Sequence, residues 1–470
     1  MGSGQIRTLR VCAVAAGCLA VTWAIASSAV AKPFLYVPNY GTGNVSGVSA
    51  APSGQLSLLG QSPFAAASEP FAGAATPDGR YVYVTNNGTD DLSGYKVAGN
   101  GSLTPLGGFP IDVDLGPQSV AVDPSGKRLY ITGFDLDHVS VWKIAGDGGL
   151  DEVGSGSSTG DAPSGLAFTP DGRFLYVPSL GNDNVHAYRI GASGSLTTAP
   201  GSPFPAGDQA NGAVVSPDGA FLYVTNRGAN SVSGYAIADN GALSATPASP
   251  YFASGPQGLA IANGGSHLYV ADTSTDKLSV FQIAGNGSLS QIPGSPVTAG
   301  DGPTAVAANQ TGDRLYVTNQ VSSSISSYQV AGDGSISAAP GSPLALDGTS
   351  PLGCMIAVVD PQKLTGFRTK AKKSQKQKGK SVKVVVKAGA DQAASLAGTG
   401  KVGKVKLKKA KGTAKAGKLG KLTLTAKGSA AEKILDALTK GKKPKAAITV
   451  KGTNAVSKTT KSKKVAVKLK

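Results

Sequence analysis

A segment of the type Leu-Tyr-Val recurs seven times along this chain, and this repeat limits the possible folds more than any other feature. Its tyrosines stand 46 or 47 residues apart, at Tyr36, Tyr83, Tyr130, Tyr176, Tyr223, Tyr269 and Tyr316. A period of this length fits four short antiparallel strands per repeat, as in a propeller blade, and is too long for a leucine-rich repeat. We therefore predict an all-β protein whose main domain is a seven-bladed β-propeller.

Turn signals divide each repeat into hairpins. A Pro-Asp-Gly turn precedes the Leu-Tyr-Val strand, as at Pro77–Gly79 and Pro170–Gly172. Proline presets φ in such turns and glycine accepts the positive φ that they need. A second signal, Asn-Gly or Asp-Gly, follows the next strand, as at Asn100-Gly101, and is typical of a two-residue hairpin loop.

The two ends of the repeat array predict how the ring closes. The chain enters at a Leu-Tyr-Val strand, Phe34 to Val37, without the innermost strand of its own blade. It leaves with Pro351 to Asp360, an innermost-type strand with no blade behind it. Pairing these two segments would complete the seventh blade and remove exposed sheet edges. The predicted propeller therefore spans residues 32–360.

The first 31 residues have the features of a signal peptide. Arg7 and Arg10 precede the uncharged apolar run Val11 to Ala26, and Ala29-Val30-Ala31 supplies small residues for cleavage. We expect a secreted, cell-surface or periplasmic protein with no transmembrane segment after cleavage. An uncleaved anchor is the alternative, although the apolar run is near the lower length limit for a span.

The C-terminal quarter differs sharply in charge from the rest of the chain. From Lys363 onward there are 32 Lys and Arg against three acidic residues, whereas the remainder holds 13 basic and 25 acidic residues. We predict a basic linker at 361–380 and a lysine-rich, β-sandwich-like domain at 381–470. Five alternating segments indicate strands, and a capping box at Ser429–Glu432 indicates one short helix.

This domain is similar in pattern to the lysine-rich immunoglobulin-like modules of bacterial surface proteins. Its charge predicts binding to anionic cell-envelope polymers, and a solvated basic face without a specific partner is the alternative. Nucleic acid is the least favoured partner, because Phe367 is the region's only aromatic residue and lysine largely replaces arginine.

Candidate binding residues lie in the loops that follow the Leu-Tyr-Val strands, at one end of the predicted central channel. They are Asn86, Asp91, Asp135, Asp183 and Asp272. They predict a polar or cation-binding propeller face that meets a protein or glycan ligand. Ordinary turn chemistry is the alternative, since Asn and Asp bond their own backbone.

The sequence contains no signature of a metal or another cofactor. The three histidines, His138, His186 and His267, fall in different repeats without ligand spacing. There is also no Gly-x-Ser-x-Gly elbow, phosphate loop or dinucleotide fingerprint.

The repeats resemble a known family. Tyr-Val-Thr-Asn at 83–86, 223–226 and 316–319, with Ala-Phe-Thr-Pro-Asp-Gly at 167–172, is similar to the YVTN-type propellers. It is particularly similar to the lactonase family, which includes 6-phosphogluconolactonases and muconate-lactonising cyclases. The resemblance covers about residues 33–360 and implies the propeller fold and hydrolysis of a lactone.

The chain departs from that family's catalytic pattern. Of the family's Asp-Leu-Gly-x-Asp only Asp137 remains. Ala162-Pro-Ser-Gly165 replaces Gly-Pro-Arg-His, Thr169 replaces a second histidine, and Ser179-Leu180 replaces Asn-Glu. Candidate catalytic residues are therefore limited to Asp137, His138 and Arg227. These losses favour an exported binding scaffold, and the alternative is a secreted lactone hydrolase of the 6-phosphogluconolactonase-like family.

Overall fold

The computed structural model describes residues 33–154 and 156–351 with their side chains. Beyond them it describes only the backbone of strands, at 357–359, 368–371, 374–375, 381–389, 394–402, 405–414, 420–427, 445–454 and 460–469. The predicted signal peptide and the predicted helix that begins at Ser429 lie outside these residues.

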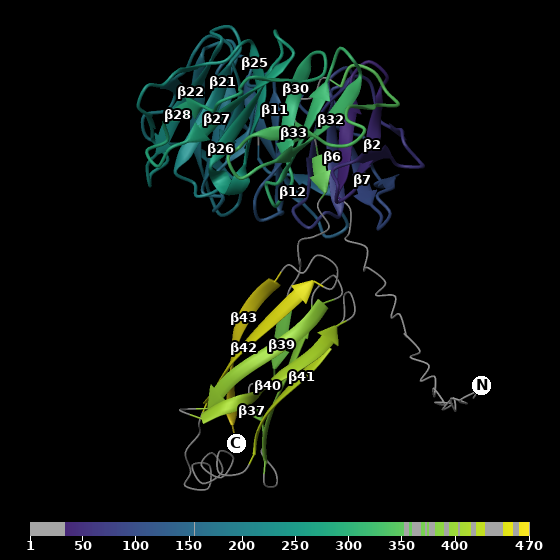
Figure 1. Cartoon of the computed structure of the whole chain (residues 1–470), viewed down its shortest axis with the longest axis vertical. Helices are drawn as coiled ribbons and strands as arrows, with labels where there is room; N and C mark the ends of the chain where they lie inside the picture. Colours follow the sequence, from purple (N-terminus) through teal and green to yellow (C-terminus); the bar gives the residue numbers. More distant parts are fainter. Residues whose placement is uncertain are drawn as a thin grey trace, which may run out of the picture.

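Seven small sheets pack side by side around a ring and are coloured from purple to green in chain order (Figure 1). Each is a blade, and its first strand lies nearest the central channel. The innermost strands are β35 (Ala357–Val359), β5 (Pro70–Ala75), β10 (Pro117–Val122), β15 (Ala167–Phe168), β20 (Ala210–Val215), β25 (Pro256–Ala262) and β30 (Pro303–Ala308), for blades 1 to 7 in turn.

The second and third strands form the body of each blade. The second strands carry the repeated tyrosine and are β1 (Phe34–Asn39), β6 (Tyr81–Asn86), β11 (Arg128–Gly133), β16 (Phe174–Ser179), β21 (Phe221–Asn226), β26 (His267–Asp272) and β31 (Arg314–Asn319). The third strands are β2 (Asn44–Ala50), β7 (Asp91–Val97), β12 (His138–Ile144), β17 (Asn184–Ile190), β22 (Ser231–Ile237), β27 (Lys277–Ile283) and β32 (Ser324–Val330).

The outer position of each blade is shared by two short strands, where the sequence predicted one. The fourth strands are β3 (Leu56–Leu58), β8 (Leu103–Pro105), β13 (Leu150–Glu152), β18 (Leu196–Thr198), β23 (Leu243–Ala245), β28 (Leu289–Gln291) and β33 (Ile336–Ala338). Beside each lies a two-residue strand that pairs with the other half of the third strand: β4 (Phe64–Ala65), β9 (Ile111–Asp112), β14 (Ser157–Ser158), β19 (Phe204–Pro205), β24 (Tyr251–Phe252), β29 (Val297–Thr298) and β34 (Leu344–Ala345). A short 3-10 helix, η1 (Asn263–Gly265), joins β25 to β26.

The predicted ring closure is confirmed. β35 pairs antiparallel with β1, with Ala357 opposite Tyr36 and Val359 opposite Phe34. The last innermost strand therefore completes the blade that the first three strands begin, as the incomplete ends of the array indicate.

The repeated tyrosine holds neighbouring blades together. Six of these buried side chains donate a hydrogen bond to a glycine carbonyl in the outer hairpin of the next blade, for example from Tyr83 to Gly148 at 2.7 Å. Burial raises the pKa of each of these six tyrosines, to about 12 for Tyr130, so the hydroxyls stay protonated donors. The regular spacing of the tyrosines thus reflects one contact repeated around the ring.

The threonine that follows in the motif forms a second connection between blades. Thr225 is fully buried and lies beside a break in the register of β20 with β21. Its hydroxyl accepts from the Gly212 amide at 2.8 Å and donates to the Gln257 carbonyl of the next blade at 2.7 Å. Thr85 makes the equivalent contacts with Ala72 and Gln118.

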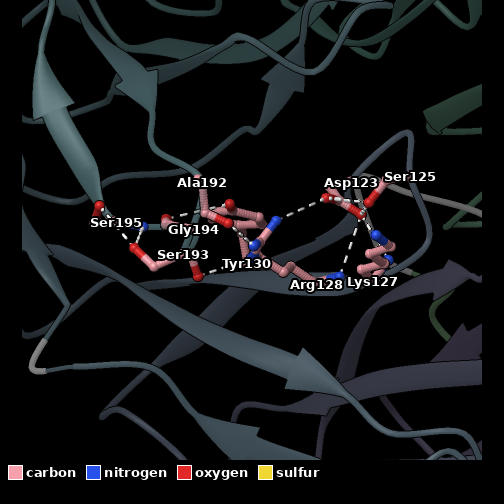
Figure 2. Close-up of polar contacts among 9 residues, drawn as sticks. All are labelled: Asp123, Ser125, Lys127, Arg128, Tyr130, Ala192, Ser193, Gly194 and Ser195. Carbon is pink, nitrogen blue, oxygen red and sulfur yellow. Dashed lines mark hydrogen bonds and ion pairs between the residues drawn. The ribbon is translucent and has the colours of Figure 1, made fainter.

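The two ends of the propeller differ in their loops. We call the end with the Pro-Asp-Gly turns and outer hairpins the turn face. There Arg128 lies between the Asp123 carboxylate, 3.7 Å away, and two carbonyls of the next blade's hairpin (Figure 2). Arg80 and Arg173 likewise reach from their own turn aspartates to the next blade.

The backbone of the lysine-rich region forms one sheet in the strand order β36-β38-β41-β40-β39-β42-β43-β37. Its strands are β36 (Arg368–Ala371), β37 (Ser374–Gln375), β38 (Ser381–Gly389), β39 (Ala394–Val402), β40 (Val405–Ala414), β41 (Gly420–Lys427), β42 (Lys445–Asn454) and β43 (Thr460–Leu469). The sandwich-like arrangement stays a prediction. Within the described part of the chain there is no helix with the length and hydropathy needed to cross a membrane.

Candidate functional site

The loops that join second to third strands all lie at the end opposite the turn face. Asn86, at the end of β6, pairs with Pro70 at the start of β5, so the segments that enter the innermost strands lie at this end as well. We call this end the loop face. It contains the five predicted binding residues and the three predicted catalytic residues.

The motif asparagine fixes the hairpin at the loop face. The fully buried Asn86 amide donates to the Asp91 carboxylate at 2.5 Å and to the Ser93 hydroxyl at 2.9 Å. Asn39, Asn226 and Asn319 make the same two kinds of bond in their blades. The Asn86 amide nitrogen and the Asp91 carboxylate therefore bond to each other and to the strand, which is a structural role. The Asn86 Oδ1 is buried and accepts no hydrogen bond from the described residues.

Asp272 takes the asparagine's place in blade 6. Its side chain is 2% exposed and accepts a hydrogen bond from the Ser279 hydroxyl at 2.5 Å. Burial raises the pKa of this carboxyl from its ordinary value to about 6. The group is thus a buried acid inside the hairpin, and it shares with the asparagines the bond to the serine of the third strand.

Asp137 and Asp183 connect their loops to the next blade. Both have a positive φ, 54° and 55°, which Asp adopts more readily than most residues. The Asp137 carboxylate accepts from the Ala162 amide at 2.9 Å, and Asp183 accepts from the Gln209 amide at 2.8 Å. Asp90, Asn230 and Asp276 do the same elsewhere in the ring. Because the same bond recurs around the ring, the Asp137 carboxylate serves to connect its loop to the next blade.

Blade 3 departs from the asparagine arrangement. Gly133 stands where four of the other second strands end in Asn, and His138 begins the third strand. Asp114 fills the space, in a position that is glycine in four other links, at Gly160, Gly207, Gly300 and Gly348. A Cβ on Gly133 would lie 2.9 Å from the Asp114 Cβ, so the two sites cannot both carry large side chains.

The exchange brings a carboxylate to a histidine. Asp114 Oδ2 lies 2.8 Å from His138 Nε2, and the two side chains are 19% and 17% exposed. A carboxylate this close can hold one ring nitrogen of an imidazole, which leaves the other nitrogen, Nδ1, to accept a proton. This pair can therefore act as a general base on a bound ester or on water.

The surroundings of the pair are acidic and partly apolar. Asp135 is exposed, and the backbone of its loop bonds to the link that holds Leu115. Leu115 and Leu136 are 49% and 47% exposed. Arg227 is exposed two blades away, and no hydrogen bond or ion pair between described residues joins its side chain to His138 or Asp137.

Blade 4 also lacks the asparagine, and its changed motif positions are occupied by structural contacts. The Ser164 hydroxyl bonds to Asn211 at the channel, and Thr169 bonds within its Pro-Asp-Gly turn. Ser179 ends β16 near His186, whose pKa is lowered by burial, so this imidazole stays neutral. Ser164 and Ser179 lie toward the loop face, whereas Thr169 lies in a turn at the opposite end of the channel.

A cavity of about 320 Å³ lies in the central channel, mainly between apolar innermost strands. Its lining includes Ser119, Leu166, Phe168, Val215, Leu259 and Val306. The described residues contain no group of three or more side chains suited to hold a metal ion.

Seven sheets closed around a channel define a seven-bladed β-propeller, and a carboxylate–histidine pair lies among the loops of one face. The family model of the lactonase seven-bladed β-propellers matches residues 19–200 and 197–295. The chain therefore belongs to this lactonase family.

Solved structures share the fold at low sequence identity. A candidate 6-phosphogluconolactonase of Bacteroides fragilis is 18% identical, with a TM-score of 0.63 over 71% of this chain and 99% of that one. The periplasmic gluconolactonase of Pseudomonas aeruginosa is 22% identical, with a TM-score of 0.59 over 70% and 99%. No curated protein matches the chain significantly.

Sequence reasoning missed Asp114 as the partner of His138. The signal was present in the repeat, because Gly133 and Asp114 each break the pattern of their position. Only the fold shows that the two departures compensate for each other.

Proposed function

We propose that this protein is a lactone hydrolase in which His138 acts as the general base and Asp114 holds it. Family membership supports this function better than the binding scaffold that the sequence favoured. The observation that carries it is the 2.8 Å contact between Asp114 and His138, beside Gly133, which replaces the structural asparagine of other blades.

The reaction follows from the geometry of the pair. His138 Nδ1 takes a proton from water while the water oxygen bonds to the lactone carbonyl carbon. The ring C–O bond then breaks, and the alkoxide takes the proton back from the imidazolium, giving a hydroxy acid. Asp114 stabilises the imidazolium between these steps.

The charge around the pair indicates the substrate class. Asp112, Asp135 and Asp137 lie within three residues of Asp114 or His138 in the sequence, whereas Arg227 is two blades away on the loop face. A phosphorylated or carboxylated lactone would meet like charge here. We therefore propose a neutral lactone, with Leu115 and Leu136 supplying apolar contact.

Export and envelope attachment belong to the same proposal. The predicted signal peptide would place the enzyme in the periplasm or outside the cell, and the lysine-rich region would bind anionic envelope polymers. A protein or glycan ligand at the propeller face is the remaining function if the enzyme reading fails.

The test is hydrolysis of a lactone panel by the purified chain, with neutral sugar and alkyl lactones beside phosphorylated ones. His138→Gln should lower the rate about 100-fold or more, and Asp114→Asn should lower it as well. His267→Gln, on the turn face, is the matched histidine control and should keep wild-type rates. Full activity in His138→Gln would exclude it as the base, and no turnover by the wild type would favour the binding scaffold.

A further inference from the structure

The loop face carries far more acidic than basic side chains. Fourteen acidic residues belong to it, against the two basic residues Arg227 and Lys277. The acidic residues are Glu69, Asp90, Asp91, Asp112, Asp114, Asp135, Asp137, Asp161, Asp183, Asp208, Asp272, Asp276, Asp301 and Asp347. Seven are exposed and are distributed around the ring: Asp112, Asp135, Asp161, Asp183, Asp208, Asp276 and Asp301.

The turn face is nearly neutral, and its charges are paired. Its described residues include ten acidic and eight basic side chains. Five ion pairs with Lys or Arg lie there, among them Arg80 with Asp78 and Arg173 with Asp171. None of the ion pairs among the described residues joins Lys or Arg to a loop-face carboxylate. The negative charge of the loop face is thus much larger than the positive charge that Arg227 and Lys277 supply there.

The chain leaves the propeller at the opposite end from this acidic face. β35 runs antiparallel to β1, so it passes from the loop-face side at Ala357 to the turn-face side at Val359. Only residues 360–367 separate it from β36, the first strand of the lysine-rich sheet. Eight residues span at most about 29 Å when fully extended, so the lysine-rich sheet begins within that distance of Val359.

We propose that copies of this protein associate head to tail, with the loop face of one copy against the lysine-rich region of the next. The region from Lys363 onward has 32 basic and three acidic residues and so supplies the charge that the loop face lacks. Two different, complementary surfaces of one chain pair heterologously and build rings or open chains of subunits. Val321, which is 75% exposed, adds apolar contact at the loop face.

Sedimentation velocity of the full-length protein over a range of concentrations tests this proposal. At about 20 mM salt the screening length is roughly 20 Å, and at about 500 mM it is roughly 4 Å. We expect oligomers that grow with protein concentration in low salt and a monomer in high salt.

Matched triple variants locate the contact. Asp112→Asn, Asp208→Asn and Asp301→Asn together remove three exposed loop-face charges that accept no side-chain hydrogen bond among the described residues. They should weaken association roughly tenfold, as expected for three exposed ion pairs. Asp147→Asn, Asp239→Asn and Asp333→Asn make the same change on the turn face and should leave association unchanged.

A mixing experiment tests the head-to-tail geometry. The loop-face triple variant keeps its lysine-rich region, so it should add to the end of a wild-type chain and stop growth there. Shorter wild-type oligomers on its addition support the proposal. A monomer at every salt concentration would overturn it, as would compaction in low salt without concentration dependence, or equal loss of association in both triple variants. Lactone hydrolysis is measured in a separate assay, so a failure of the proposed enzymatic function would not affect the conclusion about association.

Discussion

Replacing Gly133 and Asp114 of blade 3 with the asparagine and glycine of the other blades tests whether these two residues act together. Gly133→Asn alone places a Cβ 2.9 Å from the Asp114 Cβ, closer than such atoms approach in proteins. Overpacking of this kind costs about 1–3 kcal/mol of unfolding free energy. Adding Asp114→Gly removes the obstruction and restores the residue pair found at Asn226 and Gly207.

The double variant should recover most of the lost stability. The asparagine introduced at position 133 would face Ser140, which stands in register where Ser233 accepts a bond from Asn226. The recovered hydrogen bond is worth about 1 kcal/mol, so unfolding should return to within about 1 kcal/mol of the wild type. Lactone hydrolysis should remain lost, because His138 has no carboxylate partner.

Urea unfolding followed by tryptophan fluorescence measures the stability, and the lactone panel measures the activity. An active double variant would refute the reasoning, because the pair would then be dispensable. Equal instability of the single and double variants would show that Gly133 and Asp114 do not compensate for each other.

Two further perturbations test the packing argument. Thr225→Val keeps the side-chain volume but leaves the Gly212 amide and the Gln257 carbonyl unpaired, so the free energy of unfolding should fall by about 2–4 kcal/mol. Thr89→Val, at an exposed site, is the control, and equal unfolding midpoints for the two variants would contradict the assigned bridge. Asp272→Asn should raise the free energy of unfolding on the order of 3 kcal/mol above pH 6. The reason is that the raised pKa of Asp272 makes the wild type lose stability as the pH rises from about 4 to 6. A gain in stability that is the same at pH 4 and pH 8 would exclude this cause.

The sequence predicted most of the propeller because its strongest signals are local. The spacing of Tyr36, Tyr83 and the later tyrosines fixes the blade length, and the structure shows that these positions repeat one contact to the next blade. The incomplete ends predicted the pairing of β35 with β1. The division of the outer position between β18 and β19 was not predicted, because a two-residue strand has no periodicity of its own.

The candidate site was predicted only in part, because side-chain pairing between loops has no local signature. His138 and Asp137 were selected from one loop, and the structure gives them different surroundings, a carboxylate for the first and a backbone amide for the second. Asp114 lies 24 residues before His138, on a link whose direction only the folded blade defines. Asn86 and Asp91 carry the right groups for binding, but their contacts lie within the hairpin.

The departures from the repeat are therefore the most informative residues for function. An asparagine at the end of the second strand gives a blade two buried hydrogen bonds, and blades 1, 2, 5 and 7 keep them. In blade 3 these hydrogen bonds are absent, and a half-buried Asp114 and His138 stand in their place. We expect a partly exposed acid–histidine contact to stabilise the hairpin less than two buried hydrogen bonds do. Proteins break such local rules mainly at functional or strained sites. Here the departure fits catalysis, because the exchange places a carboxylate-held imidazole on the open face of the propeller.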